Sequence, residues 1–206
     1  MTARLVPLAA AWLATLAFAV LPARPAAAAD ADASPASPPH ETHTTVTLAT
    51  GAGSVLDTAR GAVPSTQGSL RLTLPLARAL ALELLGTAGF AFGHDEPDDA
   101  WLRLGLGLRL EDAWASVRPY ASFRLVHIHF APSETWASHP LDSFAGSSTE
   151  GLQHRSGMAT AVGISFPVPR AGSPLRAMAE AELSWLPVGD PPSWFLGVEA
   201  GLGYAF

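Results

Sequence analysis

The sequence of 206 residues contains no cysteine and no lysine, and beyond its N-terminal segment it has no long apolar run. Without cysteine the chain has neither a disulfide framework nor a cysteine that could carry a lipid anchor. No later stretch is apolar over the roughly 20 residues that a membrane-spanning helix requires. The formal net charge of −6 argues against nucleic-acid binding, because that function needs basic residues to neutralise phosphates.

The N-terminal segment has the features of a targeting sequence. Arg4 precedes an apolar run that ends in a series of alanines before Asp30. A short basic region, an apolar core and a small-residue cleavage site predict a secretory signal peptide over residues 1–29, with an uncleaved membrane helix as the alternative. Residues 30–42 are small, polar and proline-rich, so we expect a flexible tether before a single domain at 43–206.

The segment AWLRLGLGLRLED, at 100–112, alternates strictly. Leucine occupies every second position from Leu102 to Leu110, and the other parity carries Trp101, Arg103, Arg109 and two glycines. A helix would scatter these leucines around its axis, whereas a strand sends alternate side chains to opposite faces. The segment is therefore predicted to be a strand with one apolar and one polar face.

Seven further segments alternate in a similar way and are separated by turns. The predicted strands cover residues 43–51, 69–76, 80–92, 100–112, 117–130, 156–167, 175–186 and 194–206. Segments of about ten residues suit strands that cross a membrane. We therefore predict an all-β fold, an eight-stranded antiparallel up-and-down transmembrane β-barrel with no free edge, whose leucines meet lipid. A soluble sandwich or lipocalin-like barrel is the alternative.

The predicted connections alternate in length. Those near 77–79, 111–116 and 168–174 are short and are expected to face the periplasm, whereas 52–68 and 131–154 are expected to be extracellular contact surfaces. Aromatic residues near the predicted strand ends are expected to form girdles at the two membrane interfaces. They are Phe92, Trp101, Phe130, Trp185 and Trp194 on the outer side, and Trp114, Phe166, Tyr204 and Phe206 on the periplasmic side.

The C-terminal segment WFLGVEAGLGYAF alternates up to its last residue, Phe206, with Tyr204 on the same face. This ending resembles the C-terminal signature of bacterial outer-membrane β-barrels. The pattern over 43–206 resembles the OmpA-like and opacity-type porin family of small barrels. The resemblance implies a monomeric, integral outer-membrane protein of a Gram-negative bacterium, in contact with lipids and lipopolysaccharide, with a structural or surface-interaction role. It also implies that Tyr204 and Phe206 are an assembly signal for the barrel assembly machinery.

Ten charged residues fall on the inward parity of the predicted strands. They are Arg71, Arg103, Arg109, Arg118, Arg124, Arg176, Glu83, Glu180, Glu182 and Glu199. An eight-stranded interior is just wide enough for side chains to fill it, and unpaired charges there would be costly. We therefore predict that these residues form a salt-bridge network in the lumen, with a small-solute channel as the alternative.

Two histidines on one predicted strand raise the question of chemistry. His127 and His129 point the same way and could share a metal ion, with a third ligand from His94, Asp95, Glu96 or His139. The alternative is that they lie at the level of the lipid headgroups and bind nothing. We adopt this second interpretation and predict neither a metal nor a cofactor.

Some barrels with the same strand number are lipid A deacylases, which use a Ser/His/Glu set at the outer rim. The position two residues after His127 is His129 rather than a serine, although Ser133 and Glu134 lie nearby in the expected loop. A non-enzymatic barrel is therefore the predicted function. A lipid-modifying hydrolase that uses His127 and a loop acid is the alternative.

Overall fold

The computed structural model describes residues 43–57, 61–92, 99–112, 117–145, 151–168, 173–188 and 193–206. The predicted signal peptide (1–29) and tether (30–42) lie outside these residues. Within the described ranges, no helix has the length and apolar character needed to cross a membrane.

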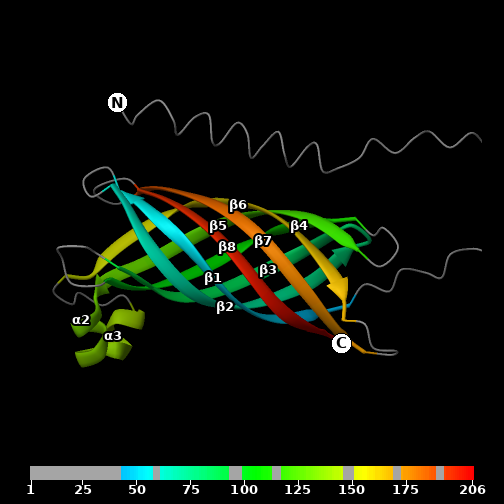
Figure 1. The fold of residues 1–206 in the computed structure, drawn as a ribbon, viewed down its shortest axis with the longest axis horizontal. Helices are drawn as coiled ribbons and strands as arrows, with labels where there is room; N and C mark the ends of the chain where they lie inside the picture. The colour runs from blue at the N-terminus through cyan, green and yellow to red at the C-terminus, as the bar shows by residue number, and fades with distance from the viewer. Residues whose placement is uncertain are drawn as a thin grey trace, which may run out of the picture. The chain divides into compact units, whose positions relative to one another are not determined.

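Eight antiparallel strands close into a barrel (Figure 1). They are β1 (Thr45–Asp57), β2 (Gly61–Ala77), β3 (Leu80–Ala91), β4 (Asp99–Glu111), β5 (Arg118–Pro132), β6 (Gln153–Pro167), β7 (Leu175–Val188) and β8 (Ser193–Ala205). Each strand pairs with its neighbour in sequence, and β1 pairs with β8 from Thr45↔Ala205 to Asp57↔Ser193. The predicted fold class is therefore confirmed.

The barrel has two distinct ends. At the first, which we call the terminal end, β1 begins and the chain finishes at Phe206, whose backbone N–H donates to the carbonyl of Thr44 at 2.9 Å. At the opposite end, which we call the helix end, two short helices lie between β5 and β6 (Figure 1). These helices are α2 (Ser133–Ser138) and α3 (Pro140–Ala145).

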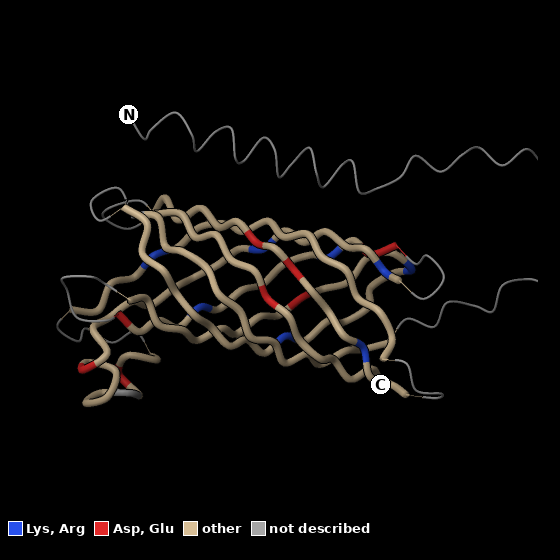
Figure 2. Tube along the Cα trace, viewed as in Figure 1, with Lys and Arg blue, Asp and Glu red and all other residues tan. Residues whose placement is uncertain are grey.

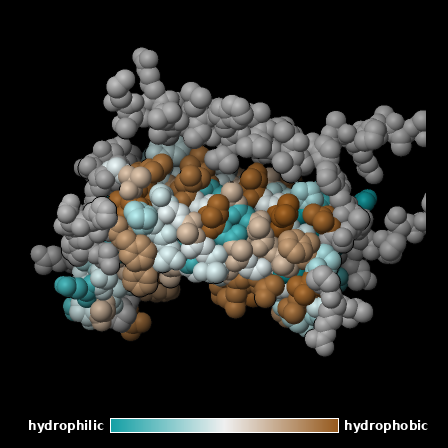
Figure 3. Space-filling model, viewed as in Figure 1, coloured by the Kyte–Doolittle hydropathy of each residue, from teal (hydrophilic) through white to brown (hydrophobic). Residues whose placement is uncertain are grey.

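The outward wall carries large apolar side chains. Leu104, Leu106 and Leu108 are each about half exposed. Similar exposure is found on the other strands at Leu48, Leu70, Leu84, Phe123, Leu125, Val198 and Leu202, and Figure 3 shows such side chains spread along the visible wall. Buried charged side chains lie inside, so the two faces are the reverse of those in a soluble barrel. Lipid is the environment that suits such a wall.

The first hairpin differs from the prediction. Residues 52–68 were expected to form a long loop, but β1 continues to Asp57 and β2 already begins at Gly61. The outward positions Ser54 and Pro64, which face each other in the register, are not large apolar residues. No apolar stripe therefore marks this part of the hairpin as strand. Gly61 has a φ of +78°, a conformation that glycine adopts without steric cost.

The second expected loop, 131–154, is partly regular. β5 runs to Pro132 and β6 begins at Gln153, and both helices lie between them. The indole N–H of Trp136 on α2 donates to the carbonyl of Ala100 on β4 at 2.9 Å. Ala100 and Ala131 have outward parity but are buried. The β5–β6 excursion, as we call the two helices at 133–145, therefore packs against the outward wall.

Candidate functional site

A layer of buried charges crosses the middle of the lumen. Its members are Arg71, Arg103, Arg109 and Arg124 with Glu83, Glu180, Glu182 and Glu199. Figure 2 shows acidic and basic positions gathered along the barrel between its ends. Four cations thus accompany four anions, which balances the formal charge of this central layer.

Glu180 on β7 is the hub of the central layer. Arg71 donates to its two carboxylate oxygens at 2.5 and 2.9 Å, and Arg124 donates to the same two oxygens at 2.8 and 2.9 Å. Arg124 also donates from Nε to Glu83 at 2.6 Å and from Nη1 to Glu182 at 2.6 Å. The planar guanidinium suits such multiple contacts, because its donors are fixed in a fork.

The central layer extends to both sides of this hub. Glu199 on β8 accepts hydrogen bonds from Gln67 at 2.5 Å, from Ser69 at 3.0 Å and from Arg71 at 3.2 Å. Arg103 on β4 forms an ion pair with Glu182 on β7. These contacts join strands that are not neighbours, so the layer braces the barrel from within.

Two of the predicted network residues lie instead near the terminal end. Arg118 contacts Glu111 at 3.3 Å, and about a quarter of each side chain is exposed (26% and 22%). Arg176 donates to the carbonyl and the hydroxyl of Ser165 at 3.1 and 3.2 Å. Arg109 joins this group to the central layer, because it lies 2.5 Å from Glu111. Glu111 was not among the predicted network residues, because it lies where the predicted strand meets the link that follows it.

Between the central layer and the helix end, apolar side chains fill the lumen. The ring of Trp101 lies 6.3 Å from that of Phe130 and 5.6 Å from that of Phe195, measured between centroids. We call this cluster the apolar plug, and its other buried members are Val55, Ala91, Val126, Ile128, Ala159 and Leu186. The guanidinium of Arg103 lies 5.3 Å from the Phe195 ring, a cation–π contact between the two levels.

The plug corrects the predicted aromatic girdle. Trp101 and Phe130 were expected at the membrane interface, but they are 3% and 7% exposed and point inward. Their inward parity on β4 and β5 decides their position. Trp185 and Trp194 do lie on the outward wall, stacked with centroids 6.0 Å apart. Trp114 lies outside the described residues.

At the helix end of the lumen, a small hollow lies beside the plug. It is lined by residues that include Val55, Asp99, Phe130 and Arg155, and it offers about 20 Å³. Such a volume holds little more than one water molecule. The central layer and the plug therefore fill the lumen at two successive levels.

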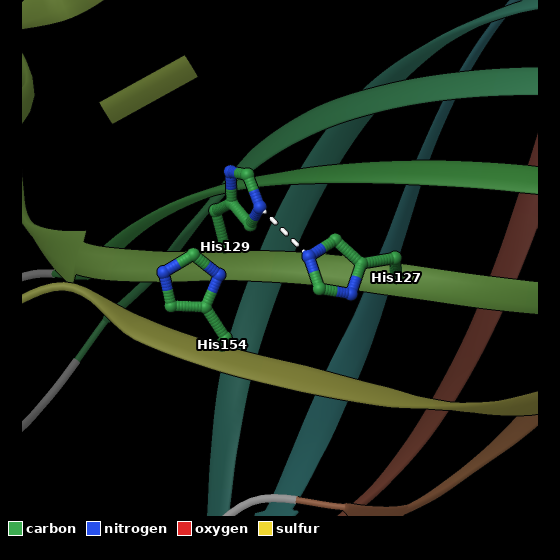
Figure 4. Close-up of side chains that lie close together, drawn as sticks. All are labelled: His127, His129 and His154. Carbon is green, nitrogen blue, oxygen red and sulfur yellow. Dashed lines mark hydrogen bonds between the residues drawn. The ribbon is translucent and has the colours of Figure 1, made fainter. Parts of the chain in front are cut away.

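A cluster of three histidines lies on the opposite, outward face of the wall, near the helix end. His127 and His129 share one parity of β5, and His154 on β6 is the register partner of His129. Figure 4 shows the three rings turned toward one another. The centroid of the His129 ring lies 4.7 Å from each of the other two. His154 was not predicted to join these residues, because it falls in the expected loop at 131–154, whereas β6 already begins at Gln153.

Of the other ligands that the sequence suggested, only His139 lies within the described residues, and it does not join this cluster. His139 is instead paired with Asp142 at 3.9 Å, and both side chains are more than half exposed. His94, Asp95 and Glu96 lie outside the described residues. Ser133 and Glu134, suggested as partners for catalysis, begin α2.

Each of the two β5 histidines has a further hydrogen-bond partner. His129 Nδ1 lies 3.0 Å from the carbonyl oxygen of Ser143, and His127 Nδ1 lies 2.6 Å from Oγ of Ser156. The two Nε2 atoms lie 2.8 Å apart. A carbonyl only accepts hydrogen bonds, so His129 carries its proton on Nδ1 and presents a lone pair at Nε2.

No protein-family model matches the sequence, and no curated protein matches it. Among solved structures, that of Neisserial surface protein A aligns with a TM-score of 0.61 at 12% identity, covering 79% of this chain and 97% of that one. The chain has the fold of the small outer-membrane β-barrels. The N-terminal barrel domain of Pseudomonas aeruginosa OprF also aligns, with a TM-score of 0.46 at 16% identity, covering 79% of this chain and 98% of that domain.

The predicted assembly signal lies at the terminal end of this outer-membrane barrel fold. The rings of Tyr204 and Phe206 are 5.0 Å apart, and both side chains are exposed, at 47% and 67%. His43 Nδ1 lies 2.8 Å from the carbonyl oxygen of Phe206, which holds the last residue beside the start of β1. Their recognition by an assembly machinery stays a prediction.

Proposed function

We propose that the protein is an integral outer-membrane barrel with a closed lumen, which serves a structural or surface-interaction role through its helix end. The observation that carries this proposal is the filling of the lumen at two levels. A hydrated ion would have to separate the buried ion pairs of the central layer and also displace the rings of the plug. Both steps are costly, because they expose unpaired charges and open packed apolar contacts.

The proposal places the helix end outside the cell. In outer-membrane barrels the short turns face the periplasm and the longer connections face outward. Here the two-residue turn at 78–79 lies at the terminal end, and the β5–β6 excursion lies at the helix end. Export by the predicted signal peptide and insertion as a monomer among lipids and lipopolysaccharide belong to the same proposal.

The β5–β6 excursion is the proposed contact surface. Trp136 fixes α2 to the wall, while α3 exposes Leu141 and Phe144 by 80% and 56%. Exposed apolar side chains on an anchored element are typical of interaction sites. The excursion therefore offers a fixed apolar surface to a partner at the cell surface.

Two measurements on the wild-type protein test the proposal. Heating should shift the gel mobility of the protein in the isolated outer-membrane fraction, because a closed barrel resists detergent until it is boiled. Planar-bilayer recordings of the purified barrel should show no steady conductance. A soluble periplasmic protein without a mobility shift would contradict membrane insertion, and a steady conductance would contradict the closed lumen.

One contact favours a second candidate, a lipid-modifying hydrolase. The hydroxyl of Ser156 is within hydrogen-bond distance of His127, which in turn contacts His129, all on the outward wall. A serine beside a histidine that a third group orients is the usual arrangement of an activated nucleophile. If this candidate is correct, Ser156→Ala abolishes a deacylated lipid product in mass spectra of outer-membrane lipids. Identical lipid spectra for the wild type, this variant and a deletion strain would exclude it.

A further inference from the structure

We infer that His127, His129 and His154 form a binding site for a divalent transition-metal ion of the zinc class on the outward wall of the barrel. This inference is independent of the closed lumen, because it depends only on the geometry of β5, β6 and the excursion between them. It is also distinct from the hydrolase candidate, because it is tested by measuring metal binding rather than a change in the lipids.

The three side chains already lie close together. One nitrogen of each ring lies within 4.8 Å of the corresponding nitrogens of the other two, and Figure 4 shows these edges converging. Zinc binds imidazole nitrogen at about 2.0–2.1 Å in a tetrahedron, so neighbouring ligand atoms lie about 3.3 Å apart. The Nε2 atoms of His127 and His129, 2.8 Å apart, would have to separate only slightly. The remaining distances between the nitrogens, which are within 4.8 Å, would have to reach the same value through rotation of the side chains.

The backbone holds the ligands in place. His127 and His129 are two residues apart on one strand, and the ladder pairs His129 directly with His154. The rings therefore project from a continuous sheet rather than from a loop, which favours a rigid site. Only the β5–β6 pairing is needed to bring the three residues together.

Hydrogen bonds at the Nδ1 atoms of His127 and His129 leave the Nε2 atoms available as metal ligands. A metal-binding histidine usually donates its other N–H to a carbonyl or a similar acceptor, which fixes the tautomer and orients the ring. The carbonyl of Ser143 has this role for His129, and the hydroxyl of Ser156 can accept from His127 in the same way. In the metal-free site, the contact between the Nε2 atoms of His127 and His129 needs one proton, and His127 supplies it because His129 presents a lone pair. When the ion binds, it takes the place of this proton between the two Nε2 atoms. His127 then carries its hydrogen on Nδ1, where it can donate to the hydroxyl of Ser156.

The site is accessible and has an open position. His154 is exposed, His127 is partly buried and His129 is buried, so an ion can enter from the side of His154. Three protein ligands leave the fourth position of a tetrahedron for water. Imidazole is a preferred ligand for zinc, copper and nickel but not for calcium or magnesium, so the site should reject the latter two.

The experiment uses the untagged barrel, folded in detergent and stripped of metal. Cobalt(II) should bind at one equivalent with the intense visible absorption of a tetrahedral ion, and zinc should displace it. His154→Ala and His129→Ala should abolish this absorption, whereas His139→Ala should retain it, because His139 lies in the excursion outside the cluster. Ser156→Ala should weaken binding by about 10–100-fold, as expected for loss of an outer hydrogen-bond partner.

The mobility shift on heating controls for folding in every variant. The inference is overturned if the folded wild-type barrel shows no tetrahedral cobalt spectrum. It is equally overturned if folded His154→Ala binds cobalt as tightly as the wild type does, or if calcium displaces the ion as well as zinc.

Discussion

Arg71 on β2 and Glu180 on β7 meet across the lumen, with two hydrogen bonds of 2.5 and 2.9 Å, although their strands are not neighbours in the sheet. The two residues are 109 positions apart in sequence. Their contact connects opposite parts of the wall, so it can form only when the barrel has nearly closed. The stability that these ion pairs contribute therefore depends on closure of the barrel.

Glu180→Gln should lower the free energy of unfolding by about 3–5 kcal/mol, because two buried arginines lose the carboxylate that they share. Urea unfolding of the barrel in lipid vesicles, followed by tryptophan fluorescence, measures this loss. Arg118→Gln is the control at the partly exposed terminal end, where its ion pair with Glu111 contributes about 1 kcal/mol or less. Equal stability of Glu180→Gln and the wild type would contradict the role assigned to this hub.

Trp101→Ala should also destabilise the barrel, by about 3–5 kcal/mol, because it leaves a cavity in the apolar plug. The conductance in planar bilayers should nevertheless stay at the wild-type level, because the central layer still fills the lumen. Trp185→Ala, on the outward wall, is the control that removes an indole without opening the plug. A steady conductance in Trp101→Ala would show that the plug alone closes the lumen.

Gly107 marks a place where the lumen has no room for a side chain. A Cβ atom there would overlap the carbonyl oxygen of Phe123 and would lie 2.8 Å from both Cα and Cγ of Arg124. Gly107→Ala should therefore cost about 1–3 kcal/mol through overpacking, measured by the same urea unfolding. Gly86→Ala is the control, since a Cβ at Gly86 meets nothing within 4 Å. Similar stabilities of the two variants would refute the steric argument.

Phe206→Ala tests the predicted assembly signal. The variant should reach the outer membrane in smaller amounts, while the fraction that inserts keeps the mobility shift on heating. Quantitative blots of membrane fractions measure this effect, and Phe92→Ala provides a control with an exposed phenylalanine directly after β3. Wild-type levels of Phe206→Ala in the membrane would exclude a role for the terminal ring.

The strand pattern could be predicted because each strand carries one stripe that faces lipid and one that faces the lumen. Leu104 and Arg103 illustrate the two stripes on β4, since one side chain is half exposed and the other is buried. The prediction failed where this contrast disappears. Ser54 and Pro64 are outward residues of the first hairpin that are not large and apolar, so its strands were predicted too short.

One error in the interior came from setting the pattern aside, and one on the wall needed information that the pattern does not contain. Trp101 was assigned to a girdle by its residue type, although its parity, shared with Arg103, places it in the lumen. His154 could not be placed beside His129 from the sequence, because strand register across a long connection is not fixed by the length of that connection. The face on which a side chain lies could therefore be predicted from its position in the alternating pattern. The pairing register of β5 and β6 could be obtained only from the structure.

The strands are longer than a membrane crossing requires. Their lengths range from 12 residues in β3 to 17 residues in β2, whereas roughly 9–11 residues are enough to cross a bilayer. If the additional residues extend beyond the lipid at the helix end, the part of the protein outside the membrane is a ring of hydrogen-bonded strands rather than a set of free loops. Antibodies against the native protein would then recognise a shape that boiling destroys, and linear peptides from the sequence would be poor substitutes for it.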